Sequence, residues 1–323
     1  MTTGTGRPVA APEPPRIDAF TRTDRGVYRD AFVEVHACPA PAPLARRSRH
    51  MVRTPHFDVV HDGPRVLLTH RVPAEGIDDD LSGLLADELF SPGWLRGPEM
   101  FERLFTGIVL TSGPDPLASW TLFYRNTLRR VETVLARGGG VGGGVGGGVG
   151  GGVGGAHGTI DDYAPVYAFA EQLLEPGSVL ELGCCFGFLS LRLAAAGHHV
   201  TASDLNRGTV ALLDAVAPLL GVSLRTVVAD AGRVPAPERS ADTVLLIHLL
   251  EHLDSDHGDR VLTEAIRLAR RRVVVAVPLE DEADETWGHV RTLSLADLDA
   301  WGSRTGLAHT VHEHHGGWLV LDR

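Results

Sequence analysis

The second half of the chain alternates short apolar runs with longer amphipathic stretches, and this alternation limits the possible folds more than any other feature. Strands are predicted for the apolar runs at 178–182, 199–203, 224–229, 243–248 and 273–277. Helices are predicted where apolar residues recur three and four positions apart, at 187–196, 209–220 and 258–270. Strands that are apolar on both faces and are joined by helices form a parallel sheet. Residues 157–323 are therefore expected to form an α/β domain.

The end of the chain predicts a hairpin added to this sheet. Residues 308–314 and 318–321 flank Gly316 and Gly317, which suit a two-residue turn between antiparallel strands. The expected fold class is thus a Rossmann-like α/β sheet with a C-terminal antiparallel hairpin.

A stretch of glycine and valine alone, Gly138–Gly155, divides the chain. Its valines recur every fourth residue, which fits neither collagen nor a phosphate-binding loop, so we interpret residues 138–156 as a flexible linker. Residues 1–15 are Pro-rich and are expected to be a disordered tail. Residues 16–137 are expected to form a smaller α+β accessory domain, with a hairpin at 57–71 and helices that begin near Asp78, Pro98 and Pro116.

Charge and composition exclude several classes of partner. The net charge is −11 and lies in residues 157–323, which contain 13 arginines and 24 acidic residues. A nucleic acid would therefore be repelled by this half. No apolar run is long enough to span a bilayer, and the first residues lack a signal peptide. The three cysteines cannot form a disulfide framework, which predicts a reducing, cytoplasmic location.

The turn after the first predicted strand carries the cofactor motif. Gly183 and Gly187 lie four residues apart, and Glu181 stands just before them. A dinucleotide site uses G-x-G-x-x-G to face a pyrophosphate, whereas a carboxylate here favours a cationic cofactor without phosphate. S-adenosylmethionine (SAM), with its ammonium and sulfonium groups, is such a cofactor. Cys185 occupies the middle glycine of the pattern acid-x-Gly-x-Gly-x-Gly.

Two further acids follow the next two predicted strands. Asp204 ends the second strand, where a carboxylate can bind both ribose hydroxyls, and Asp230 follows the third, near the expected adenine. Acids at strand ends also form caps and turns, so each alone has a structural alternative. Together with Glu181 they predict a SAM site.

The loop after the fourth predicted strand is expected to face the transferred group. His252 is the favoured general base, with Glu251 as a second candidate. The alternatives are that Glu251 caps the following helix and that His248 packs under the sheet.

A second group of residues suits a sugar acceptor. Trp287, His289 and Arg291 combine an aromatic ring, an imidazole and a guanidinium, and His289 is expected to anchor the substrate. His314 is expected to line the substrate cleft. A metal site at His312 and His314 is discounted, because neither cysteine nor a helical histidine pair supports it.

Several motifs resemble one family. They are Gly-Cys-Cys-Phe-Gly-Phe-Leu at 183–189, His-Leu-Leu-Glu-His-Leu-Asp at 248–254, Gly-His-Val-Arg at 288–291 and His-Glu-His-His-Gly-Gly-Trp-Leu at 312–319. The chain resembles the mycofactocin oligosaccharide methyltransferases of actinobacteria, which are class I SAM-dependent enzymes. The resemblance implies O-methylation of a sugar hydroxyl on the oligosaccharide attached to mycofactocin. The alternatives are a SAM-dependent methyltransferase of another small metabolite and a non-catalytic or NAD-binding Rossmann-like protein.

Overall fold

The computed structural model describes residues 17–24, 26–38, 51–138, 159–283 and 288–323. The predicted tail at 1–15 lies outside these residues, as does the predicted linker at 138–156 apart from Gly138. Within the described residues, no helix is long and apolar enough to cross a membrane.

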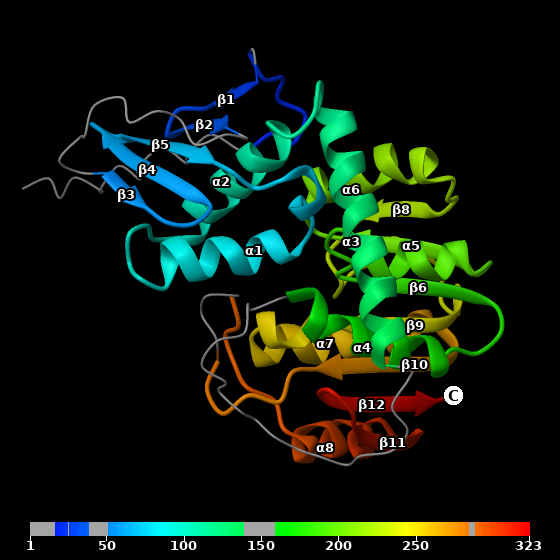
Figure 1. Ribbon diagram of the computed structural model, residues 1–323. Helices are drawn as coiled ribbons and strands as arrows, with labels where there is room; N and C mark the ends of the chain where they lie inside the picture. Colours follow the sequence, from blue (N-terminus) through cyan, green and yellow to red (C-terminus); the bar gives the residue numbers. More distant parts are fainter. Residues whose placement is uncertain (1–16, 25, 39–50, 139–158, 284–287) are drawn as a thin grey trace, which may run out of the picture.

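The second half forms a seven-stranded sheet in the order β11-β12-β10-β9-β6-β7-β8 (Figure 1). Its strands are β6 (Ser178–Leu182), β7 (His199–Asp204), β8 (Arg225–Val228), β9 (Ala241–Ile247), β10 (Ala269–Val277), β11 (Ala308–Glu313) and β12 (Gly317–Asp322). Neighbouring strands from β10 to β8 are parallel, and β12 runs antiparallel to both β10 and β11. The predicted Rossmann-like sheet with its C-terminal hairpin is therefore confirmed.

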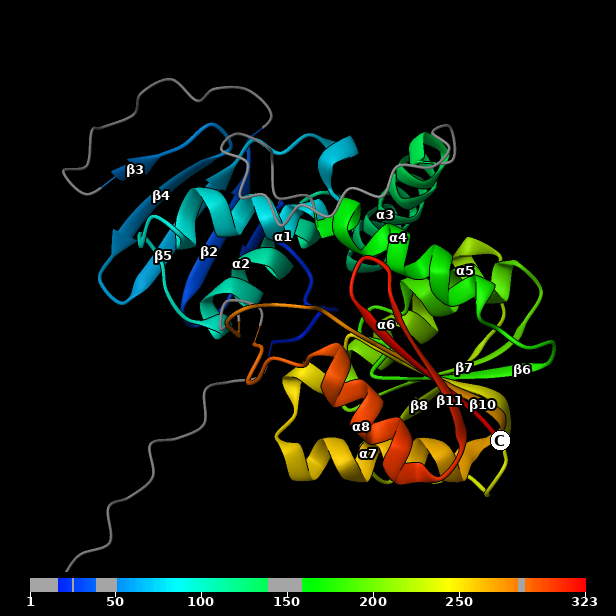
Figure 2. The ribbon, with the colours of Figure 1, turned by 90° about the horizontal axis from the view of Figure 1, so that it is seen from below.

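Helices cover both faces of this sheet. Successive strand residues point to opposite sides, so strands that are apolar throughout need helices to pack against on both faces. The helices are α4 (Thr159–Gln172), α5 (Phe188–Ala195), α6 (Arg207–Val216), α7 (Ser255–Leu268) and α8 (Leu295–Thr305). Leu180 and Leu182 share a core with α7 and α8, whereas Val179 shares one with α4 and α5 (Figure 2). The helix starts follow from local capping. Asn206 accepts hydrogen bonds from the amides of Gly208 and Thr209, for example.

The first half forms a five-stranded sheet in the order β1-β2-β5-β4-β3. The strands are β1 (Val27–Arg29), β2 (Val33–Ala37), β3 (Met51–Arg53), β4 (Phe57–Asp62) and β5 (Arg65–His70). The predicted hairpin is β4 and β5, joined at Gly63-Pro64, but β2 pairs in parallel with β5. The helices are α1 (Asp80–Leu85), continued by a π-helical turn (Ala86–Phe90), then α2 (Pro98–Leu110) and α3 (Pro116–Gly138).

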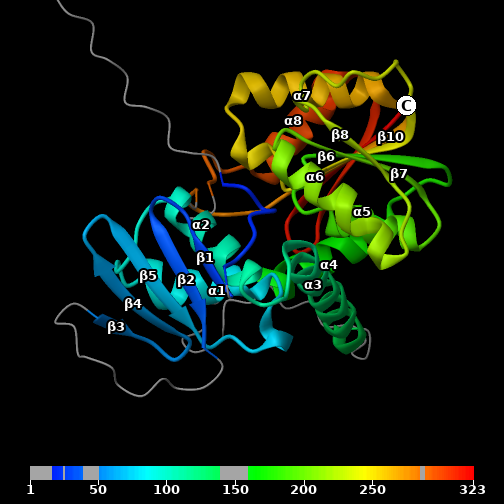
Figure 3. The same cartoon turned by 90° about the horizontal axis from the view of Figure 1, so that it is seen from above.

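The two halves share a hydrophobic core. Side chains of α2 and α3, such as Phe105 and Phe123, belong to the same buried cluster as Phe188 of α5 and Leu213 of α6. Figure 3 shows α3 where the two halves meet. The first half is therefore packed directly against the helices that follow β6 and β7, where the predicted cofactor motif lies.

Candidate active site

The turn from β6 into α5 adopts a backbone that explains its glycines. Gly183 and Gly187 have φ angles of +72° and +74°, and a Cβ at either position would come within 2.7 Å or 2.5 Å of Leu249 or Leu213. Cys185 also has a positive φ, 48°, and its side chain is exposed. The middle position of the motif is thus one where glycine would be unstrained. The contact with Leu249 also joins this turn to the loop after β9.

Asp204, at the end of β7, fixes the shape of this turn. Its Oδ2 accepts a hydrogen bond from the Cys185 amide at 2.9 Å, and its Oδ1 accepts one from the Asn206 amide at 2.8 Å. The next residue, Leu205, leaves 70% of its surface exposed. A carboxylate and an uncovered apolar side chain therefore stand together beside the glycine turn.

Asp230 lies just beyond β8 and is exposed. Its Oδ1 accepts hydrogen bonds from the Gly232 amide and from Nε2 of His257 in α7, both at 2.8 Å. The Gly232 amide and then the His257 ring lower the pKa of the Asp230 carboxyl. His257 was not singled out by sequence reasoning, because only the packing of α7 brings it to Asp230.

Glu181 faces the opposite way from Leu180 and Leu182 and lies under α5. Its side chain is buried and accepts a hydrogen bond from the Ser190 hydroxyl. Burial raises the pKa of Glu181 to about 7. The carboxyl that sequence reasoning placed opposite a cationic cofactor is thus held through α5, the helix that begins at Gly187.

One aromatic side chain of the same turn, Phe186, packs against the first half of the chain. The Phe186 ring lies among the rings of Phe105, Trp120, Phe123 and Tyr124, with centroid separations of 5.3–6.2 Å. These partners lie in α2 and α3. Sequence reasoning assigned no role to them, since only the shared core places them at the motif.

Two tyrosines and an aspartate add to the surroundings of the turn. The rings of Tyr163 and Tyr167 in α4 lie 4.8 Å apart and are tilted by 38° to each other, and Asp79 lies at the start of α1. Burial raises the pKa of Asp79 to about 7. This shift of the Asp79 carboxyl was not expected from the sequence.

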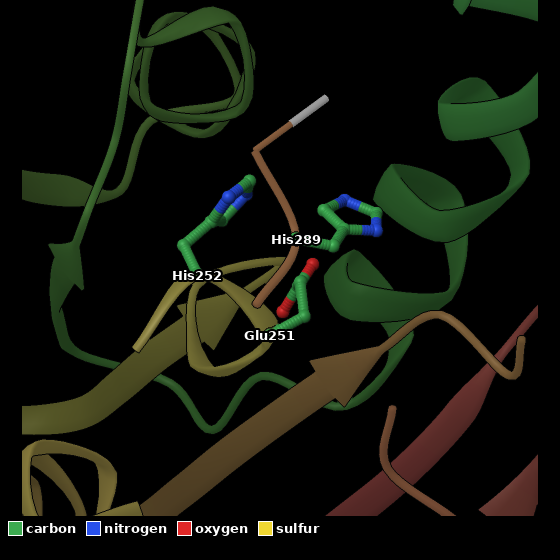
Figure 4. A group of neighbouring side chains, drawn as sticks. All are labelled: Glu251, His252 and His289. Atoms are coloured by element: carbon green, nitrogen blue, oxygen red, sulfur yellow. The ribbon is translucent and has the colours of Figure 1, made fainter. Parts of the chain in front are cut away.

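The loop after β9 brings the candidate bases together at the carboxyl end of the sheet. Glu251 and His252 lie in a short 3-10 turn, Leu250–His252, and His289 lies in the segment after β10. One possible ligand atom from each of the three lies within 4.8 Å of the others (Figure 4). The rings of His252 and His289 meet edge to face at 5.0 Å. The structure thus unites the three predicted catalytic residues in one cluster.

The electrostatics of this cluster are unusual. Glu251 is 1% exposed, and burial raises its pKa to about 8. Burial lowers the pKa of His252, and burial lowers that of the neighbouring His248 to about 4. His248 has a φ of 51° and a half-buried side chain. The cluster therefore combines a carboxyl that resists ionisation, that of Glu251, with the imidazole of His252, which resists protonation.

The predicted substrate residues are less closely grouped. Trp287 lies outside the described residues. Arg291 donates from Nε to the Leu250 carbonyl at 3.0 Å and lies 5.3 Å from the Trp301 ring, so it braces the 3-10 turn. His314 lies in the turn between β11 and β12, where its ring packs 4.5 Å from that of Phe169.

One comparison with known proteins finds a family model that matches part of this chain. Residues 179–272 match a family model described as a methyltransferase domain. A search of curated proteins finds no match.

Three of the solved structures that are similar to this chain are described here by identity, coverage and TM-score. A Pyrococcus horikoshii protein is 14% identical, covers 51% of this chain and 91% of its own, and has a TM-score of 0.43. Magnesium protoporphyrin IX methyltransferase from Synechocystis is 20% identical over 53% and 86%, with a TM-score of 0.41. A SAM-dependent methyltransferase from Aquifex aeolicus is 18% identical over 49% and 87%, with a TM-score of 0.41.

The family match covers the strands that carry the glycine turn, Asp204, Asp230 and Glu251. The sheet around them has the reversed strand β12, which lies between β10 and the edge strand β11. Residues 179–272 are therefore similar to a methyltransferase domain.

Proposed function

We propose that this protein transfers a methyl group from SAM to a sugar hydroxyl of the mycofactocin-linked oligosaccharide. The observation that carries the proposal is the cluster of Glu251, His252 and His289 at the carboxyl end of the sheet. The loop that holds Glu251 and His252 touches the glycine turn through Leu249. Groups able to activate a hydroxyl thus stand next to the proposed cofactor site.

Different residues are proposed to bind the ribose, adenine and methionine parts of SAM. Asp204 keeps lone pairs free on both carboxylate oxygens beyond the two backbone amides it binds, so it can accept hydrogen bonds from the ribose hydroxyls. Leu205 offers an exposed apolar side chain to the adenine face, and Asp230 lies beyond the next strand for its amino group. Glu181, Gly183, Cys185 and Gly187 shape the site of the methionine part.

The reaction needs a proton acceptor and exact alignment. A lone pair of the hydroxyl oxygen forms the new C–O bond while the C–S bond breaks, and its electron pair stays on sulfur to give S-adenosylhomocysteine (SAH). The hydroxyl proton leaves as this bond forms. His252 is the predicted base, and its lowered pKa keeps the ring neutral and able to accept a proton at pH 7.

The nature of the acceptor rests on the resemblance and on charge. The motifs at 183–189, 248–254, 288–291 and 312–319 resemble the mycofactocin oligosaccharide methyltransferases. An uncharged sugar suits a domain whose acidic residues outnumber its arginines, since a polyanionic acceptor would be repelled. His289, Arg291, Trp287 and His314 are the residues proposed to position it.

Two measurements test the proposal in order. Calorimetry of the full chain with SAH and with NAD should show binding of SAH alone. Incubation with SAM and a mycofactocin-containing extract should then add one methyl group to the glycosylated cofactor, detected by intact-mass analysis. Tight binding of NAD would favour the Rossmann-like alternative. Binding of SAH with methylation of a different metabolite would overturn the acceptor but not the reaction.

The proposed base can be tested separately. His252→Ala should lower kcat by roughly 100-fold, the scale of general-base catalysis, and leave SAH affinity unchanged. His289→Ala should chiefly raise the KM of the acceptor. Full turnover in His252→Ala would remove its assignment, and the reverse pattern would exchange the roles of the two histidines.

A further inference from the structure

The Glu251 carboxyl is buried but has no hydrogen-bond partner among the described residues. Its side chain is 1% exposed, and neither Oε1 nor Oε2 has a hydrogen-bond partner among the described residues. The nearest imidazole nitrogen of His248 is 3.9 Å from Oε1, beyond hydrogen-bonding distance. Buried carboxylates are normally paired, hydrogen-bonded or bound to a metal ion, because an isolated buried charge is costly. Two empty carboxylate oxygens therefore point to a missing ligand.

The two imidazoles beside Glu251 are each oriented through one nitrogen. Nδ1 of His289 lies 2.8 Å from Oε2 of Glu280, and Nδ1 of His252 lies 3.2 Å from the carbonyl oxygen of Gly288. A carbonyl oxygen and a carboxylate only accept hydrogen bonds, so in both rings Nδ1 carries the proton. Each ring can then offer only Nε2 as a ligand. Histidines that bind metals are oriented in this way by a carboxylate or a backbone carbonyl.

The spacing of the three side chains suits a single ion. One carboxylate oxygen of Glu251 and one ring nitrogen of each histidine lie within 4.8 Å of one another (Figure 4). Three atoms this close can all lie within about 2.8 Å of one centre, and an inward movement of about 0.7 Å would bring each to the 2.0–2.2 Å typical of zinc ligands. Such a movement is within the reach of side-chain torsions, because His252 and Gly288 are exposed residues of two separate loops.

We propose that Glu251, His252 and His289 bind a divalent transition-metal ion such as Zn²⁺ or Mn²⁺. Two nitrogens and one oxygen favour these ions over Mg²⁺ and Ca²⁺, which prefer ligand sets made of oxygen alone. Three protein ligands leave coordination positions open, as in catalytic metal sites. The sequence did not suggest this site, because its ligands come from two separate loops and lack a recognisable spacing.

The role of this ion rests on the proposed function. An acceptor hydroxyl that binds at an open position would lose its proton more readily, because the ion stabilises the negative oxygen. With the ion bound, Nε2 of His252 would be a ligand and could not accept a proton, so this role would replace the base role proposed above and the proton would pass to water. The ion site itself does not depend on this role and can be tested without any methyl acceptor.

The first experiment measures binding of the metal alone. The untagged full chain is freed of metal with a chelator and titrated with Co²⁺ by visible absorption and with Zn²⁺ by calorimetry. We expect one site that is absent or at least 100-fold weaker in Glu251→Gln, His252→Gln and His289→Gln. Mg²⁺ at the same concentrations should not bind there. Unchanged affinity and spectrum in all three variants would overturn the proposal.

Two variants make this result specific. Glu280→Gln leaves every ligand in place but replaces the charged acceptor that orients His289 with a neutral amide, so it should weaken binding by about 10–100-fold. His56→Gln is the matched control, because His56 makes a similar pair with Glu88, with Nδ1 2.6 Å from Oε1, in the first half of the chain. It should bind the ion like the wild type. If Glu251→Gln does not fold, Glu280→Gln and His289→Gln decide the outcome.

A second experiment separates the ion from the methyl transfer. The chelated protein should still bind SAH, and it should transfer methyl groups only after Zn²⁺ or Mn²⁺ is restored. Full turnover of a chelated protein shown to contain no metal would reject the ion's role and leave the proposed function standing. Binding of the ion without any methyl transfer would reject the proposed function and leave the metal site standing.

Discussion

The Phe186 ring provides a sharp test of how the two halves of the chain cooperate. Phe186→Ala removes a side chain that leaves the glycine turn and inserts among four rings of α2 and α3. We expect the variant to fold less stably and to bind SAH less tightly, because the turn loses its anchor while its backbone stays intact.

The size of the effect follows from these contacts. Removing a fully buried phenylalanine costs about 3–5 kcal/mol, and Phe186 is only half-buried. Its edge-to-face contacts with Phe123 and Tyr124 add about 0.5–1.5 kcal/mol for each pair. The free energy of unfolding should therefore fall by about 2–4 kcal/mol. Phe186→Leu keeps most of the volume and should cost about 1 kcal/mol.

Urea unfolding followed by tryptophan fluorescence measures this change. Phe20, which is 38% exposed, supplies the control, and Phe20→Ala should change the free energy of unfolding by less than about 0.5 kcal/mol. If Phe186→Ala were no more destabilising than Phe20→Ala, the aromatic contacts would not hold the halves together, and the reasoning would be refuted.

Three further predictions concern separate parts of the molecule. Asp204→Asn turns one acceptor of a backbone amide into a donor, so SAH affinity measured by calorimetry should fall by about 1–3 kcal/mol, whereas Asp214→Asn, an exposed control, should bind normally. Deletion of Gly139–Gly152 should shift Tm by no more than about 2 °C, because α3 and α4 pack against each other and a short connection suffices; a large drop would contradict the linker interpretation. Burial lowers the pKa of His70 to about 4, so the unfolded chain binds its proton more tightly and the free energy of unfolding should fall by about 3 kcal/mol as the pH drops from about 6.5 to 4. His70→Gln should lose this part of the decline in urea unfolding, and an identical pH profile would count against it.

The second sheet was largely predictable, because strands buried on both faces leave a continuous apolar signal. The run at 178–182 matches β6 residue for residue, and the other strands differ by a few residues at their ends. The helices α4 and α8 were not predicted, since α4 contains Pro165 and its apolar residues are spread around the helix. The fold of the first half also escaped prediction, because its sheet depends on the parallel pairing of β2 with β5 across a long segment.

Site residues could be predicted from the sequence only where they directly follow a predicted strand. Glu251 and His252 follow β9 directly, so a parallel sheet places them at its carboxyl end. The contacts that orient the site come from elsewhere in the chain. Glu280 reaches His289, His257 reaches Asp230, and the rings around Phe186 come from residues before the linker. Such partners depend on how separate elements pack, which residue spacing does not encode.

The insertion of Phe186 into α2 and α3 has a consequence for engineering. The two halves look modular in sequence, since a glycine-valine stretch divides them. Their shared core means that exchanging residues before 138 for those of a relative would also replace the rings that hold the glycine turn. A chimera made to accept a different substrate would therefore disturb cofactor binding as well, unless its new first half supplies a matching aromatic socket. Recognition and catalysis in this chain are expected to evolve together.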